Sequence, residues 1–89
     1  MEKKELLKIV KEDGWALDDA ENKFKKDKDI VLAAVTQNGT ALEFVNEKFK
    51  KDKDIALAAV ESVGEDAMDL IDESLRKDED ILNALSQHG

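Results

Sequence analysis

The sequence predicts an all-α fold in which short helical hairpins of about 25 residues stack into a small α-solenoid-like domain. Three observations predict it. The four glycines stand 25 residues apart, at positions 14, 39, 64 and 89. The segments 24–35 (FKKDKDIVLAAV) and 49–60 (FKKDKDIALAAV) differ at a single position. Proline is absent, so only the glycines interrupt the helical pattern.

The period divides the 89 residues into one domain of repeated units. The units span about residues 1–26, 27–51 and 52–77, with a final half unit at 78–89. Each helix is too short to be stable alone in water, so stability must come from stacking one unit on the next. We expect about seven helices, at 3–13, 15–26, 28–38, 40–51, 53–63, 65–77 and 79–88.

The first helix of each unit begins at an aspartate. Asp27, Asp52 and Asp78 are each followed two residues later by a second aspartate. The first can accept hydrogen bonds from free backbone N–H groups of the first turn, and the second suits the helix dipole. The apolar run that follows, IVLAAV in the second unit, is typical of a helix packed between neighbours. We expect the next glycine to close this helix in the left-handed conformation.

The second helix of each unit is predicted to be amphipathic. Thr40 and Glu43 form a candidate capping box at its start. Basic pairs at its end suit the negative pole of a helix. We therefore interpret the KKDKD runs as the end of one helix and the start of the next, rather than as a charge-recognition motif. One apolar stripe is expected to face the core, formed by Ala41, Leu42, Val45 and Phe49.

The last unit departs from the period. Its apolar stripe is offset by 26 residues, which predicts a one-residue insertion just after Gly64. A compensating deletion near Ile81–Leu82 would restore Gly89 to the period and place Asn83 where Ala33 and Ala58 stand. Both changes fall near helix ends, where a repeat tolerates them.

Polar residues at the ends predict how the stack terminates. Glu5 takes the place of Ile30, Lys8 that of Ala33, and Asp19 that of Phe44 and Leu70. The N-terminal end is therefore expected to be a true cap. At the other end the retained Ile81 leaves excision from a longer array open.

The charge and composition narrow the range of partners. Twenty-two acidic against 14 basic side chains give a formal net charge of −8, which repels phosphate. We therefore expect neither nucleic acid nor an anionic membrane as the main partner. No apolar run is long enough to span a bilayer, and the start does not resemble a signal peptide. The default expectation is a cytoplasmic protein.

No constellation of residues indicates catalysis, a metal or a cofactor. Cysteine is absent and His88 is the single histidine. Residues 27–29 (DKD) begin like an EF-hand loop, but Leu32 stands where glycine is needed and Asn38 where glutamate is needed. We expect no catalytic residues, no metal ligands and no cofactor.

Residues 27–60 carry a pattern of acidic-basic-acidic, Ile-Val-Leu-Ala-Ala-Val, Gln-Asn-Gly and Ala-Leu-x-Phe. This pattern resembles the tandem repeat of the family named domain of unknown function 4116. The resemblance is strongest over residues 24–60 and weaker in the flanking units, where Glu12–Asp13 and Ser62–Val63 replace Gln37–Asn38. It implies a helical repeat module and brings no assigned activity and no functional residues.

Two residues are candidates for contact with a protein partner. Trp15 follows the first glycine, where the other units carry Thr40 and Glu65. It either packs over the first helix pair or is partly exposed as a binding anchor. Phe44 is expected in the core between adjacent units, with a groove position as the alternative. The leading hypothesis is a noncatalytic interaction or scaffold module with an unidentified protein partner; the alternative is an acidic domain that binds basic partners or cations through charge.

Overall fold

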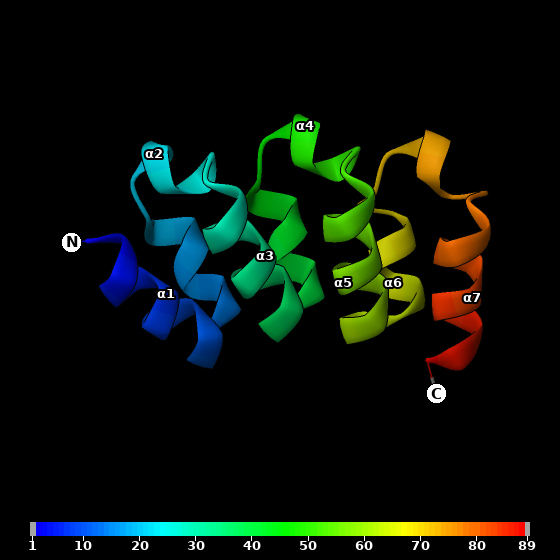
Figure 1. Ribbon diagram of the computed structural model, residues 1–89, viewed down its shortest axis with the longest axis horizontal. Coiled ribbons are helices and arrows are strands. Elements are labelled where there is room, and N and C mark those ends of the chain that lie inside the picture. Colours follow the sequence, from blue (N-terminus) through cyan, green and yellow to red (C-terminus); the bar gives the residue numbers. More distant parts are fainter. Residues whose placement is uncertain (1, 89) are drawn as a thin grey trace.

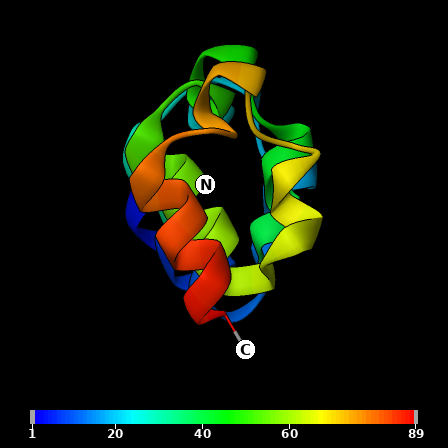
Figure 2. The same cartoon turned by 90° about the vertical axis from the view of Figure 1, so that its right-hand side faces the viewer.

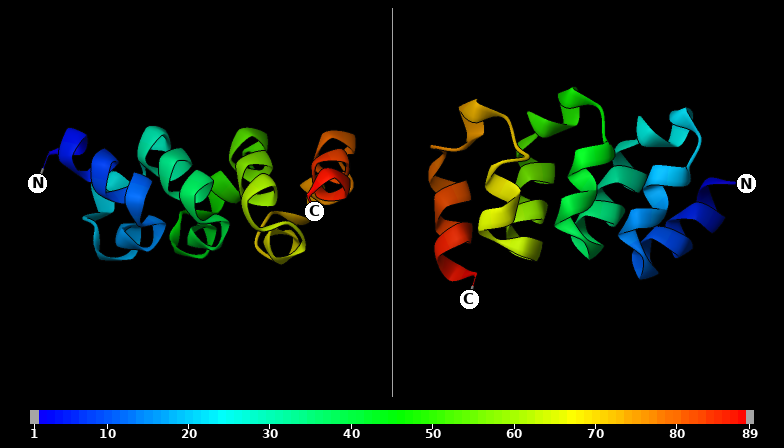
Figure 3. Two further views of the ribbon diagram at one scale, coloured as in Figure 1. Left: turned by 90° about the horizontal axis from the view of Figure 1, so that it is seen from below. Right: turned by 180° about the vertical axis from the view of Figure 1, so that it is seen from behind.

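The computed structural model describes residues 2–88 and confirms an all-α fold of stacked helical units. One layer is formed by the first helix of each unit: α1 (Lys3–Glu12), α3 (Lys28–Gln37), α5 (Lys53–Val63) and α7 (Glu79–Gln87). The second layer is formed by the shorter segments: η1 (Gly14–Asp19), α2 (Asn22–Lys25), η2 (Gly39–Phe44), α4 (Glu47–Lys50), α6 (Glu65–Met68) and η3 (Glu73–Leu75). The two layers are visible as two rows in Figure 3 and end-on in Figure 2.

The first helices begin where the sequence predicts. Asp27 accepts a hydrogen bond from Asp29 N (3.0 Å), Asp52 from Asp54 N (2.9 Å) and Asp78 from Asp80 N (2.9 Å). These side chains satisfy backbone donors that the first turn leaves free. Apolar residues three positions after each cap lie fully buried between the layers: Ile30, Ile55 and Ile81.

The prediction of a continuous second helix in each unit is wrong, because each of these segments is broken in the middle. In the second unit, η2 ends at Phe44, and the extended Val45 and Asn46 separate it from α4. The Asn46 side chain accepts a hydrogen bond from Lys48 N (3.0 Å) and so begins a new helix. A short polar side chain that bonds the nearby backbone competes with helix continuation. The break leaves the predicted stripe on the core side, with Ala41, Leu42, Val45 and Phe49 all buried.

The predicted helix-closing role of the glycines is also wrong for two of them. Among residues 2–88 only Gly64 has a positive φ, 65°. Gly14 and Gly39 instead lie against the next unit, where an added Cβ would stand 2.5 Å from Ala34 O and 2.6 Å from Ala59 O respectively. These two glycines are needed for close approach between units, not for backbone handedness.

Asn38, rather than Thr40 with Glu43, caps the second segment. Its Oδ1 accepts hydrogen bonds from Thr40 N (3.1 Å) and Thr40 Oγ1 (2.6 Å). In the first unit Asp13 does the same for Trp15 N (3.0 Å). The predicted capping box is therefore wrong by two residues, and the cap precedes the glycine.

The last unit differs in length from the earlier ones as the sequence predicts. Directly after Gly64, an α-helical turn replaces the 3₁₀ segment of the earlier units, at the predicted insertion. α7 then runs from Glu79 to Gln87, and its C-cap His88 stands ten residues after its N-cap Asp78. In α3 the C-cap Asn38 stands eleven residues after the N-cap Asp27, so α7 is one residue shorter, as the predicted deletion requires.

Candidate interaction surface

Trp15 and Phe44 contact each other on the surface. Their ring centroids are 4.7 Å apart with an interplanar angle of 65°, an edge-to-face arrangement. Trp15 remains 45% exposed, whereas Phe44 is half-buried. We refer to these two side chains as the aromatic patch. The structure thus brings together the two candidate residues identified in the sequence, at the junction of the first and second units.

The local fold positions both rings. Asp13 caps η1 through Trp15 N, which holds Trp15 in the first turn of that 3₁₀ helix. Phe44 is the last residue of η2, just before the break at Val45. Because η1 and η2 pack side by side, the start of one segment meets the end of the next. Trp15 therefore packs across the unit boundary, a contact that neither sequence alternative had named.

A ladder of ion pairs joins the first helices at one edge of the stack. Each rung is a lysine at the first helical position of one unit that reaches the capping aspartate and the second aspartate of the next. The rungs are Lys3 with Asp27 (3.1 Å) and Asp29 (3.0 Å), Lys28 with Asp52 (3.0 Å) and Asp54 (3.3 Å), and Lys53 with Asp78 (3.3 Å) and Asp80 (2.6 Å). The sequence interpretation identified the caps but missed these lysines, although Lys3, Lys28 and Lys53 share the 25-residue period.

The rungs keep the capping aspartates charged. Partial burial raises the pKa of Asp52, but hydrogen bonds from Lys28 Nζ and from the N–H groups of Ile55 and Asp54 outweigh burial. The pKa of Asp52 therefore lies below its ordinary value. The pKa of Lys28 is raised, chiefly by its hydrogen bond to Asp52. A charged, hydrogen-bonded aspartate at each unit boundary thus links the stability of the stack to pH.

We expect the free energy of unfolding to fall as the pH drops below about 4. The capping aspartates have lowered pKa values in the folded state, so the unfolded chain takes up their protons first as the pH falls. The Lys28→Ala variant should lose less stability than the wild type over this range, because Asp52 then lacks the cation that lowers its pKa. Urea unfolding at a series of pH values measures the difference.

The matched control is Lys11→Ala, which removes one positive charge from α1. Lys11 makes no ion pair with any other residue of the described part of the chain. Identical pH profiles for Lys28→Ala and Lys11→Ala would contradict a stabilising ladder. Because the lysines are solvent-exposed, added salt should also reduce the difference between wild type and Lys28→Ala.

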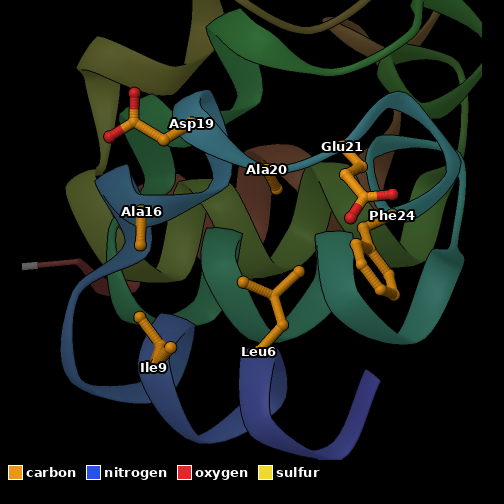
Figure 4. A pocket seen from close by; sticks show the side chains of 7 residues that line it. All are labelled: Leu6, Ile9, Ala16, Asp19, Ala20, Glu21 and Phe24. Carbon is orange, nitrogen blue, oxygen red and sulfur yellow. The ribbon is translucent and has the colours of Figure 1, made fainter. Parts of the chain in front are cut away.

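An apolar groove lies at the N-terminal end of the stack, and we call it the end groove. Its volume is about 320 Å³. Leu6 and Ile9 project from α1 toward the segment that follows η1, and Figure 4 shows Phe24 at one end. Ile9 is 38% exposed. The remaining lining residues are two small ones, Ala16 and Ala20, and two carboxylates on the rim, Asp19 and Glu21.

Residues 2–88 carry neither a metal site nor a membrane-spanning helix. No three or more His, Cys, Asp or Glu side chains in this range are arranged to hold a metal ion. Within the same range, each helix is too short or too polar to cross a bilayer. His88 is exposed at the C-cap of α7, and its ring lies against Gly64. The aromatic patch and the end groove are therefore the two candidate binding surfaces.

The family comparison agrees with the repeat seen in the structure. The model of a family described as "Domain of unknown function (DUF4116)" matches residues 4–50 and again residues 37–76. Together these matches extend over residues 4–76, more than half of the chain. Neither the curated proteins nor the solved structures contain a match to this chain.

Proposed function

The chain belongs to the family described as Domain of unknown function (DUF4116), and from that premise we propose that it is a noncatalytic protein-interaction or scaffold module. The observation that carries the proposal is the aromatic patch. A tryptophan that is 45% exposed and held in place by a second aromatic ring presents apolar area without a large entropic cost on binding.

Stacked repeats suit this role, because adjacent units extend one another's surface. The aromatic patch takes one ring from each of two units, so it depends on the stacked arrangement. Tryptophan is enriched among the few residues that dominate binding energy in interfaces. The partner is an unidentified protein. It stays a prediction that the protein binds neither nucleic acid nor a membrane. The cytoplasmic location also stays a prediction.

Partner capture with the wild type and a Trp15→Ala variant tests the proposal. We expect Trp15→Ala to weaken capture at least about tenfold, since truncating a central interface tryptophan costs about 2 kcal/mol or more. The matched control is Leu82→Ala, because Leu82 is 44% exposed but lies on α7 at the other end of the stack.

Circular dichroism of each variant shows whether the fold is retained, so that lost capture is not mistaken for unfolding. A captured protein that is lost with Trp15→Ala but retained with Leu82→Ala supports the aromatic patch. Capture that is unaffected by Trp15→Ala, or equally weakened by both variants, contradicts it.

The second candidate function is binding of basic partners through charge. The formal net charge of −8 favours it, as do the carboxylates beside the end groove. Affinity for basic peptides should then fall as salt is raised, because interactions between exposed charges are screened. An affinity that stays constant from low to high salt would exclude this function.

A further inference from the structure

We propose that the end groove binds a short, basic, amphipathic helix of a partner protein. The inference rests on the proposal that the chain is an interaction module, but it concerns a surface distinct from the aromatic patch. It also names the chemistry of the occupant.

One period along the chain, the same surface is covered. The positions equivalent to the five apolar lining residues are all buried: Val31, Ala34, Ala41, Val45 and Phe49. The first unit covers them, since η1 packs on α3 and η2, and Gly14 lies against the Ala34 carbonyl. The fold thus builds a surface that accepts a short helical segment. At the end groove, no segment from residues 2–88 takes this place, and Ile9 is left 38% exposed.

Two substitutions adapt the end groove to an occupant different from a repeat unit. Ile9 stands where Ala34 and Ala59 receive the closely packed glycines of the preceding units. A larger side chain keeps an approaching backbone farther away, so side chains rather than a glycine backbone fit here. Asp19 stands where the next unit carries Phe44; it lines the end groove, and Figure 4 shows its carboxylate pointing outward, away from the apolar side chains.

The charges select a basic occupant. Glu21 Oε2 lies 3.7 Å from Lys23 Nζ, so the negative charge of Glu21 is partly balanced. Asp19 forms no ion pair with another residue between 2 and 88. A helix with apolar residues on one face and lysine or arginine beside them would cover the groove and pair with Asp19. A second copy of this chain is disfavoured, because two molecules of net charge −8 repel each other.

The size of the groove indicates a short segment. About 320 Å³ lies at the low end of the range of about 300–1,000 Å³ for ligand pockets. Leu6 and Ile9 are three residues apart, so the α1 side extends about one helical turn. A helix of two or three turns is long enough to span it.

The probe is a fluorescein-labelled peptide of 12 residues, about three turns, built from Leu, Ala and Lys with its leucines at helical spacing. One control peptide replaces every Lys by Glu, and another replaces every Leu by Ser. Fluorescence anisotropy measures affinity, and ¹H–¹⁵N NMR locates the bound peptide. We expect the basic peptide to bind at least about tenfold more tightly than either control and to perturb residues 6–24.

Paired variants test the site itself. Asp19→Lys and Ile9→Ser should each weaken binding of the basic peptide about threefold or more. Their controls are Glu61→Lys and Leu82→Ser, which alter an exposed acid on α5 and an exposed leucine on α7. Leu82→Ser should leave the affinity unchanged. Glu61→Lys should weaken binding only through its effect on the net charge of the protein, and raised salt should remove that effect.

Equal binding of the basic and acidic peptides would overturn the inference. So would equal losses in the site and control variants, NMR changes away from residues 6–24, or self-association that is abolished by Ile9→Ser. Failure here leaves the Trp15-dependent capture of a partner untouched. The two proposals can therefore fail separately.

Discussion

Replacing Gly39 by alanine is expected to lower the free energy of unfolding by about 2–3 kcal/mol, the upper part of the range for overpacking. The added Cβ would stand 2.6 Å from Ala59 O and 2.8 Å from Val63 Cγ2. A main-chain oxygen cannot rotate away as the end of a flexible side chain can, so the second and third units would have to separate. That movement would also stretch the hydrogen bond from Gly39 N to Ser62 Oγ (3.0 Å).

A loss of stability on Gly39→Ala would distinguish a closely packed glycine from a glycine with free space around it. Where the backbone is compatible and space is available, Gly→Ala stabilises a protein by about 0.4–1 kcal/mol. Urea unfolding followed by far-UV circular dichroism measures the change. Glu43→Ala on the exposed face of the same 3₁₀ helix is the control and should stay within about 0.5 kcal/mol. A Gly39→Ala variant as stable as the wild type would refute the close packing.

The Ile55→Ala variant should lose about 3–4 kcal/mol, within the range of about 2–5 kcal/mol for truncating a large buried residue. Ile55 is fully buried on α5, which packs against both α3 and α7. Truncating the Ile55 side chain leaves a cavity, and the two layers could fill it only by moving closer together. Against a total of about 5–15 kcal/mol for a typical domain, this is a large share of the stability.

The control for this prediction is Leu57→Ala, two residues along the same helix. Leu57 is half-buried, so its truncation removes less contact and leaves no closed cavity. Urea unfolding should therefore place Leu57→Ala between the wild type and Ile55→Ala. Equal losses for the two variants would show that burial at Ile55 does not dominate the stability of the stack.

The first helices could be predicted because their signals are local. An aspartate that caps a helix acts on N–H groups two or three residues away, as Asp52 does on Asp54 and Ile55. The apolar run after it has the composition of a helix buried on most sides. The same local reasoning failed for the second helices, because Asn46 begins a new turn where the apolar spacing alone predicts a continuous helix.

The candidate surface was predictable only in part. Trp15 could be singled out because the other units carry polar residues at its position, but its contact with Phe44 depends on how two units pack. The exposed Ile9 of the end groove gave no signal, since an isoleucine on an apolar helix face is ordinarily core. The lysines of the ladder left a trace in the sequence, namely their shared period.

The sequence by itself determined the repeat, the all-α class, the starts of the first helices and the residues of the buried stripe. All of these depend on composition and on neighbours within a few positions. Only the tertiary structure decided why Gly14 and Gly39 are glycines, which lysine meets which aspartate and where the surface is hollowed. The glycine and lysine contacts join residues 20 or more positions apart, as in Gly39 with Ala59 and Lys28 with Asp52, so they exist only once the units have stacked. The end groove is lined by residues 6–24, so it forms only when α1 packs against the segment that follows it.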